Sequence, residues 1–486
     1  MEQGEGALRN KSAMPEGTLR VATINANSVG TNRFEVVRTL DNPVLNEEYA
    51  TLRKRYAEQA STTIRVVSDV FTVGMLEELR SEVVKAFGVD GIDIFDAQAA
   101  LQMGRPIPDF YACKKLDKAR LVSLLPRSQF TTNGFVTPVP SVFSKSAAVT
   151  FGTLWGAWID FFFKESTDGG AGRHWSQIKP IKHSKYPDFP AEWEPLSRQL
   201  QLLHSAIHDV ISHVLFREAA KGLQVNAIVA ELDAAAKNDE QSIRHLITNA
   251  AIHNDVVCVH EVSMRVLKSL DLVDNFTILA PATDDAETQL SALIVRFLSF
   301  ATNVTDSYLA AVAQVRDGEL DMFPKLKQSA LDTVCAIACE VTIEGKPPFV
   351  AASIHSVSNG SSSPSAVAGL AHFHDMPVIC GIDTNATFNG GKNVRRSDLD
   401  RFAESVGVNA TEIVETVHRE RTHIVHQFNK ADVTIEPKDA IYFKGLTCVE
   451  FNRDNTGKRE WIPDVCFPTH CFSSDHAILH AAFVFE

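Results

Sequence analysis

The chain has 486 residues, of which 45% are hydrophobic and 22% charged. This length exceeds that of the usual single domain, so we expect two domains, or one domain with a large insertion. The formal net charge of -13 excludes a general electrostatic attraction for polyanions, so any binding of nucleic acid would depend on local basic patches.

The N-terminal segment, residues 1–17, is polar and lacks the apolar stretch of a signal peptide. No apolar run reaches membrane-spanning length; the strongest, Ala147 to Phe163, contains Asp160 and fits a buried helix or core segment better. Eight cysteines in a chain of this length predict reduced thiols and no disulfide framework. We therefore expect an intracellular protein, cytoplasmic or nuclear, without a membrane span.

Residues 18–28 have the pattern of a strand that ends in polar residues. The following segment, residues 29–224, differs from the rest of the chain because helical periodicity dominates it, over Asn46–Ala60, Met75–Phe87 and Trp193–Ala220. We expect it to be a mainly helical insertion, either a cap over a cleft or a subdomain that binds a partner. The sequence does not identify that partner.

From residue 225 onward, apolar strands alternate with helices, which indicates an α/β layered domain. The expected strands are Asp255–Glu261, Thr333–Val341, Phe349–His355, Pro377–Asp383, Asp439–Gly445 and Ala477–Phe485. The expected helices are Gln241–Ala251, Ser365–Phe373, Asp398–Val406 and Thr411–Arg421.

Several of these strands end in acids, amides or histidines. Asn25 and Asn27 point to the same side of the first strand, as Asp383 and Asn385 do further on, because side chains alternate along a strand. Glu261 ends a run that is otherwise mostly apolar. Taken alone, each group has a structural alternative: a turn, a helix cap or a polar residue after a strand. Their order and their common placement at strand ends favour one acidic pocket.

In chain order the motifs are Thr-Ile-Asn25-Ala-Asn27, Val-His260-Glu261-Val, Ser-Ile-His355-Ser, Gly381-Ile-Asp383-Thr-Asn385 and Ser474-Asp475-His476, with Asp439 ahead of a late strand. This series resembles the endonuclease/exonuclease/phosphatase superfamily, which has the deoxyribonuclease-I-like fold. The sequence departs from the family pattern at His260, where glutamine is usual, at Ser356, where leucine is usual, and at Ile382, which separates Gly381 from Asp383.

The resemblance implies a four-layered α/β/β/α sandwich of two mixed sheets, formed by residues 18–28 and 225–486, with residues 29–224 as the helical insertion. It also implies a metal-dependent phosphoesterase. Asn25, Asn27, Glu261 and Asp475 would hold Mg²⁺, for which Mn²⁺ can substitute, and the catalytic residues would be His355, Asp383, Asn385, Asp439 and His476.

In that scheme Asp383 orients or deprotonates the attacking water and Asn385 fixes the phosphate. His476, held by Asp439, and His355 donate to the phosphoryl oxygens. Three basic residues that follow the Asp383 motif, Lys392, Arg395 and Arg396, are weaker candidates for binding substrate.

The first expectation for function is a nuclease or nucleotide phosphodiesterase that acts on nucleic acid or a small phosphate ester by in-line attack of water. The alternatives are an inositol-phosphate or lipid-headgroup phosphatase or phosphodiesterase, and a non-catalytic scaffold that retains the fold. Asn385-Ala-Thr387 is a glycosylation sequon, and a glycan there would block the cleft, which also favours an intracellular location.

Overall fold

The computed structural model describes residues 17–26, 37–112, 151–164, 172–178, 180–184, 190–272, 275–283, 289–315, 323, 335–357, 360–390, 393–420, 433–469 and 472–486. The chain divides into two compact units. Unit 1 comprises residues 1–28, 238–419 and 434–486, and unit 2 comprises residues 29–237 and 420–433. The long helix α9 (Val225–His253) runs through the boundary between them.

Unit 1 contains two six-stranded sheets, and each has a parallel pair of strands at its centre with antiparallel neighbours. Sheet 1 has the order β13-β14-β1-β2-β4-β3. Its strands are β1 (Leu19–Asn25), β2 (Val256–Ser263), β3 (Phe276–Leu279), β4 (Gln289–Arg296), β13 (Leu446–Asp454) and β14 (Ile478–Phe485).

Sheet 2 has the order β5-β6-β7-β8-β12-β9. Its strands are β5 (Leu298–Asn303), β6 (Cys335–Ile343), β7 (Phe349–His355), β8 (Val378–Asp383), β9 (Asn409–Ala410) and β12 (Asp439–Lys444). A separate two-stranded ribbon joins β10 (Val417–Glu420) to β11 (Val433–Glu436).

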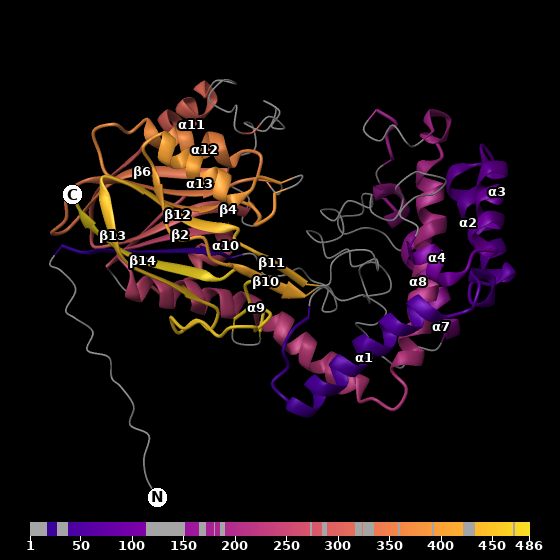
Figure 1. Ribbon diagram of the computed structural model, residues 1–486. Helices are drawn as coiled ribbons and strands as arrows, with labels where there is room; N and C mark the ends of the chain where they lie inside the picture. Colours follow the sequence, from indigo (N-terminus) through magenta and orange to yellow (C-terminus); the bar gives the residue numbers. More distant parts are fainter. Residues whose placement is uncertain are drawn as a thin grey trace, which may run out of the picture. The chain divides into compact units, whose positions relative to one another are not determined.

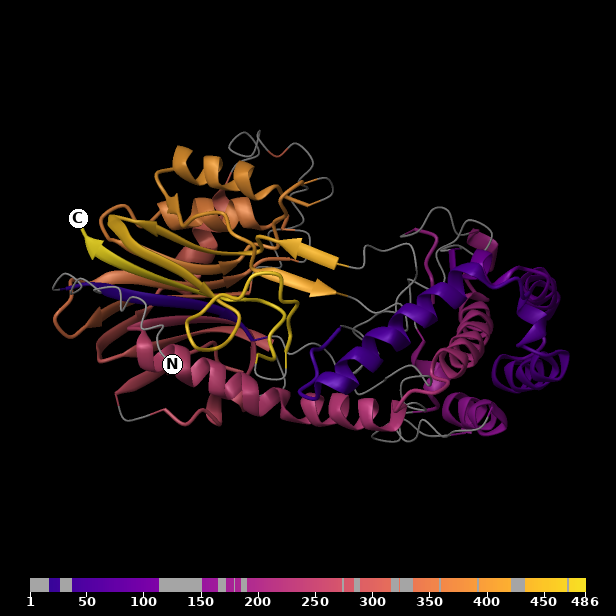
Figure 2. The ribbon, with the colours of Figure 1, turned by 60° about the horizontal axis from the view of Figure 1, so that its bottom comes forward.

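The two sheets pack face to face, and helices cover the outer face of each (Figure 1; Figure 2). An apolar core lies between the sheets, from Val21, Cys258, Leu293 and Leu479 on sheet 1 and Ile337, Ala351, Ile379 and Ile441 on sheet 2. The C-terminal part of α9 packs on sheet 1 through Ile243, Leu246, Ile247 and Ala250. Sheet 2 is covered by α11 (Thr305–Gln314), α12 (Ser363–Ala371) and α13 (Arg396–Ser405), and the short α10 (Met264–Lys268) follows β2. The predicted α/β fold with two mixed sheets is confirmed.

Over the described residues of unit 2 the regular elements are helices, apart from the part of the β10–β11 ribbon that belongs to it. Its helices are α1 (Pro43–Thr62), α2 (Val73–Phe87), α3 (Ile92–Met103), α4 (Ile107–Ala112), α7 (Phe151–Ile159), α8 (Ser197–Ala219) and the start of α9. Short helical turns occur at η1 (Val67–Asp69), η2 (Asp160–Lys164), η3 (His174–Gln177) and η4 (Ala191–Trp193). The start of α1 follows from its sequence, because the Asn42 side chain caps two backbone N–H groups and Pro43 takes the first helical position.

The boundaries of the two compact units differ from the predicted domain boundaries at α9 and at the ribbon. The predicted boundary lies between residues 224 and 225, whereas the units separate at 237 and 238, because α9 continues through the region as one helix. Residues 420–433 group with unit 2. The assignment of catalysis to one segment and of capping to the other stays a prediction.

The helix predicted for Thr411–Arg421 is wrong. Residues 411–416 are irregular and residues 417–420 form β10. Two contacts with neighbouring segments explain the difference: the Thr411 hydroxyl accepts from the Ile441 backbone N–H, and the Thr416 N–H donates to the Glu436 carbonyl. The segment is rich in β-branched residues, which suit a strand once such pairing partners are present. Among the described residues, no helix is long and apolar enough to cross a membrane.

Candidate active site

Three predicted site residues form a row across sheet 2. In the parallel pair β7–β8, His355 lies beside Asp383, and in the antiparallel pair β8–β12, Asp439 lies beside the same Asp383. Each of them stands at the end of its strand. The strand register therefore determines that one imidazole and two carboxylates meet at this edge of the sheet.

Sheet 1 contributes Asn25 and Glu261 to the same site. Asn25 is the last residue of β1 and is fully buried. On β2, a bulge between Val259 and Val262 interrupts the pairing with β4, and Glu261 takes a left-handed backbone conformation with φ 52°. A bulge changes the alternation of side chains, so His260 and Glu261 both face β7: His260 contacts Ser353 and Glu261 contacts His355.

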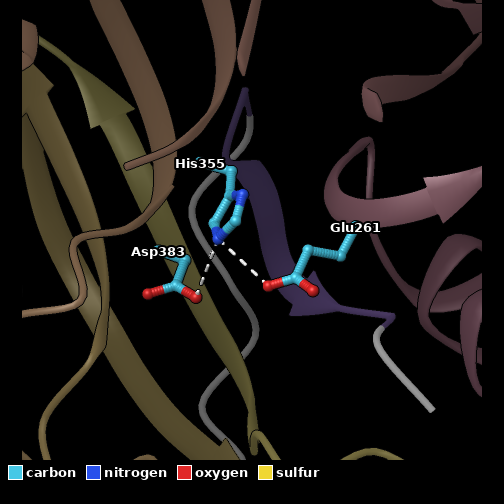
Figure 3. A group of neighbouring side chains, drawn as sticks. All are labelled: Glu261, His355 and Asp383. Carbon is cyan, nitrogen blue, oxygen red and sulfur yellow. Dashed lines mark ion pairs between the residues drawn. The ribbon is translucent and has the colours of Figure 1, made fainter. Parts of the chain in front are cut away.

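The two sheets meet at a pair of carboxylates. The Asn25 side-chain amide donates to Glu261 Oε1 at 3.0 Å and to Asp383 Oδ2 at 2.9 Å. His355 Nε2 lies between the same two carboxylates, 3.0 Å from Glu261 Oε1 and 3.7 Å from Asp383 Oδ2 (Figure 3). Burial alone would lower the pKa of His355, but the hydrogen bond to Glu261 and the charge of Asp383 outweigh it and raise the pKa. The site thus places one imidazole between two carboxylates, which stabilise its protonated form.

His476 reaches the cluster from the residues just before β14. Its Nδ1 pairs with Asp439 Oδ2 at 2.8 Å and lies 3.9 Å from Asp383 Oδ2. Burial would lower the pKa of His476, but Asp439 and Asp383 outweigh it and raise the pKa to about 9. At neutral pH the ring is therefore an imidazolium whose Nδ1–H is bound to Asp439 and whose Nε2–H remains a donor. Ser474 fixes this loop, because its hydroxyl donates to the Asn25 carbonyl at 2.7 Å and accepts from the His476 N–H.

Asp475 has a different partner from the other carboxylates. Its Oδ2 accepts from Nη1 of Arg419, which lies on β10. Its Oδ1 is buried and has no hydrogen-bond partner among the described residues, and His476 Nε2 lies 3.9 Å from it. Burial would raise the pKa of Asp475, but Arg419 and His476 outweigh it and lower the pKa.

Asn385 is held in place by hydrogen bonds with Asp383, Ser356 and Lys438. Its backbone N–H donates to Asp383 Oδ1 at 2.8 Å, and its side-chain amide donates to the Ser356 carbonyl at 2.9 Å. Its Oδ1 accepts from Lys438 Nζ at 3.2 Å. Asn385 has φ 50°, which asparagine tolerates better than most residues. These contacts fix the amide beside His355, with 3.4 Å between Asn385 Nδ2 and His355 Nε2.

Two residues of the motifs, His260 and Gly381, have structural explanations here. His260 is fully buried, and its two ring nitrogens contact the hydroxyls of Thr23 and Ser353 at 2.8 and 3.1 Å. Burial lowers its pKa to about 3, so it is a neutral histidine of the core. A Cβ on Gly381 would lie 2.4 Å from the Cβ of Cys258, so the close approach of the two sheets requires glycine there.

Most of the predicted site residues come together, and a few do not. Seven converge at the adjoining ends of the two sheets: Asn25, Glu261, His355, Asp383, Asn385, Asp439 and His476. Asp475 adjoins them through His476. Asn27 and Lys392 lie outside the described residues.

The two remaining basic candidates differ from each other. Arg395 is exposed, and its guanidinium donates to the Asn389 carbonyl at 3.5 Å. Arg396 is completely buried, so it has no surface to offer a substrate, and the expectation that it binds substrate is not met. Its guanidinium bonds to the Asp400 carboxylate and to the carbonyls of Pro437 and Asp439, which supports the start of β12 from behind.

Sequence reasoning missed two cations, Arg419 and Lys438. Lys438 adjoins Asp439, and its position beside a predicted catalytic aspartate could have identified it. Arg419 lies in the segment that was expected to be a helix, where nothing in its local sequence connects it to Asp475.

The donor set suits a hard divalent cation. Glu261, His355 and Asp383 each offer a ligand atom, and these atoms all lie within 4.8 Å of one another; the same holds for Asp383, Asp439 and His476. Magnesium in proteins takes one or two carboxylates and keeps several waters. Within the described residues, Asp475 belongs to neither group.

One family model matches part of unit 2, and several solved structures are similar to about half of the chain. Residues 65–224, within unit 2, match the model of a family described as a domain of unknown function (DUF8234). No curated protein matches the chain. Solved structures similar to the chain include D. rerio TDP2 complexed with a single strand DNA product, at 13% identity and TM-score 0.32, covering 50% of this chain and 92% of that one.

Two further similar structures are an endonuclease/exonuclease/phosphatase family protein from Bacteroides thetaiotaomicron and the human Nocturnin catalytic domain with bound sulfate anion. The first has 11% identity and TM-score 0.34, and covers 52% of this chain and 90% of that one. The second has 14% identity and TM-score 0.31, and covers 52% of this chain and 89% of that one. Similarity at this level leaves substrate and activity open.

The structure of unit 1 itself bears on the predicted family. Two mixed six-stranded sheets pack face to face, and their adjoining strand ends bring together residues of all five motifs. The resemblance of the chain to the endonuclease/exonuclease/phosphatase superfamily is confirmed at the level of this fold.

Proposed function

We propose that the chain is a magnesium-dependent phosphodiester hydrolase, in the first place a nuclease or nucleotide phosphodiesterase, which uses in-line attack by water. The observation that carries this proposal is the position of His355 and Asn25 between the Glu261 and Asp383 carboxylates. Such a cluster of oxygen donors, with an imidazolium nearby, provides what phosphoester hydrolysis requires: a cation site, a base and a donor for developing negative charge.

Glu261, together with Asn25, would hold Mg²⁺, which when bound polarises the phosphate and stabilises the charge that develops on it. Asp383 suits the role of orienting and deprotonating water. Its pKa is low despite burial, because His476, His355 and Lys438 stabilise its charged form. A carboxylate that is ionised at neutral pH can accept a proton from water.

His476 and Asn385 would bind the phosphoryl oxygens. The His476 ring is held through Nδ1 by Asp439, so its Nε2–H is oriented before substrate arrives. Fixed donors of this kind are effective because they need no reorganisation as charge develops. Asn385 is held as firmly, by Ser356 and Lys438.

An intracellular location is part of the proposal. Asn385 is 5% exposed and its side-chain nitrogen is hydrogen-bonded to a backbone carbonyl, which leaves no room for a glycan. Attachment of a glycan at this sequon would abolish the site.

A substrate panel with Mg²⁺ tests the proposal. It contains labelled single- and double-stranded oligonucleotides, inositol polyphosphates and sphingomyelin. We expect hydrolysis of the oligonucleotides, its loss in Glu261→Gln, and normal rates in Glu404→Gln, a matched control on the exposed face of α13. Activity confined to inositol phosphates or the lipid would replace the nuclease assignment by the alternative. If none of the substrates is hydrolysed, the remaining alternative is a non-catalytic scaffold that retains the fold.

A further inference from the structure

The Arg419–Asp475 pair is the feature of the site that the proposed roles do not use. Asp475 is 3% exposed, and its Oδ2 is bonded to the Arg419 guanidinium. A buried carboxylate that already has a guanidinium counter-ion has one oxygen fewer for a metal, and binding a divalent ion beside that fixed positive charge is unfavourable. Its ligand atoms also lie outside both groups of potential metal ligands in the described part of the chain.

Arg419 retains donors for another ligand. Its side chain is 18% exposed, and one nitrogen, Nη1, bonds to Asp475. A guanidinium has five N–H donors in a planar fork, a geometry that matches two oxygens of a phosphate.

Lys438 adds a second positive charge to the site, beside Asn385. Its ammonium donates to Asn385 Oδ1 at 3.2 Å, and no carboxylate of the described residues lies within ion-pair distance of it. The charge of Lys438 also helps to lower the pKa of Asp383 and of Asp475. The site therefore holds two cations besides its histidines, Arg419 at Asp475 and Lys438 at Asn385.

We propose that Asp475 is the counter-ion of Arg419 and no metal ligand, and that the Arg419 guanidinium binds a phosphate oxygen of the substrate. Lys438 binds the same phosphate from the Asn385 side. The part of the inference in which Arg419 binds a substrate phosphate rests on the proposed function. The assignment of Asp475 as the counter-ion of Arg419 is independent of it. It also replaces the sequence-based expectation that Asp475 binds the metal.

The first experiment measures Mn²⁺ binding to the full chain, with free Mn²⁺ followed by electron paramagnetic resonance. Glu261→Gln should weaken binding by about 10-fold or more, since it removes a charged ligand. Asp475→Asn should bind Mn²⁺ within about twofold of the wild type, as should Asp464→Asn, a matched exposed control. If Asp475→Asn weakens Mn²⁺ binding as much as Glu261→Gln does, Asp475 is a metal ligand and the proposal is wrong.

The second experiment tests Arg419 with two probes, hydrolysis of bis(4-nitrophenyl) phosphate at saturating Mn²⁺ and calorimetric binding of inorganic phosphate. Arg419→Gln should lower kcat/KM and weaken phosphate binding by about 10-fold or more, because it removes charged hydrogen bonds. Arg419→Lys should recover only part of either loss, since an ammonium lacks the fork. Arg401→Gln, on the exposed face of α13, is the control.

Phosphate binding and kcat/KM that stay within twofold of wild type in Arg419→Gln would overturn the role of Arg419. A chain that hydrolyses nothing would end the proposed function, but Mn²⁺ and phosphate binding would still decide the roles of Asp475 and Arg419. Far-ultraviolet circular dichroism of each variant confirms that it is folded before either measurement counts.

Discussion

Unit 1 and unit 2 both bury histidines, and their surroundings give these imidazoles opposite charge states. His476 in unit 1 faces Asp439 and Asp383, and its pKa rises to about 9. His204 in unit 2 lies on α8 against Phe110, and neither ring nitrogen has a hydrogen-bond partner among the described residues. Burial, with the charges of Arg105 and His208, lowers its pKa to about 3.

The difference teaches that burial alone does not make a site. A buried imidazole without a carboxylate partner is neutral and behaves as part of the core, whereas one held by carboxylates is a charged donor at neutral pH. In unit 1 the buried ions come in pairs: His476 with Asp439, Arg419 with Asp475, Arg396 with Asp400. These pairs are where mutations should separate chemistry from stability.

The largest expected effect is on stability, at Arg396. Arg396→Met removes the counter-ion of Asp400 and the bonds to the Pro437 and Asp439 carbonyls, so the free energy of unfolding should fall by about 3–5 kcal/mol. Arg401→Met, on the exposed face of the same helix, should change it by less than about 0.5 kcal/mol. Urea denaturation followed by circular dichroism measures both. A loss below 1 kcal/mol for Arg396→Met would mean that this pair does not support the site.

His476 should affect catalysis and leave the fold intact. Asn in place of His476 can keep the hydrogen bond to Asp439 while it removes the Nε2 donor, so hydrolysis should slow by about 10²–10³-fold, the usual cost of losing one such donor. His374→Ala, at an exposed position, is the control. Steady-state rates and melting curves of both variants check this. If His476→Asn were as active as His374→Ala, the charged imidazolium would have no catalytic role.

His204 should show the opposite behaviour, an effect on stability that depends on pH. Below pH 6.5 the unfolded chain protonates this histidine, while the folded chain keeps it neutral down to about pH 3, so stability is lost as pH falls through that window. Between pH 7.5 and 5.0 the loss is about 2 kcal/mol for this residue. His204→Leu should remove this contribution, which urea denaturation of both chains at the two pH values would detect. An equal pH dependence in the variant would show that His204 is charged, or partnered, when folded.

Much of this arrangement is predictable from the sequence, for physical reasons that differ between residues. The strands that carry Asn25, Glu261, His355 and Asp383 are compact apolar runs that end in polar residues, so both the element and its terminal side chain are visible locally. Strands such as β4 and β13 were not predicted, although both pair within sheet 1.

The residues that sequence reasoning misplaced depend on long-range contacts. Arg396 follows Asp383 closely in the chain and was expected in the cleft, but the start of α13 turns its side chain into the core, where Asp400 one turn later pairs with it. Arg419 meets Asp475 only because its segment forms the strand β10, which pairs with β11, and does not form the predicted helix. The bonds of Arg396 to the Pro437 and Asp439 carbonyls and the Arg419–Asp475 pair join residues far apart in the chain, so the neighbouring residues do not encode them.

The most direct test of the central claim is cleavage of a labelled single-stranded oligonucleotide with excess Mg²⁺ by the wild-type chain, by Asp383→Asn and by the exposed control Asp375→Asn. The convergent site predicts cleavage by the wild type and the control, its loss on chelation of the metal, and a rate at least about 10²-fold lower for Asp383→Asn. Cleavage that persists both after chelation and in Asp383→Asn would contradict the account.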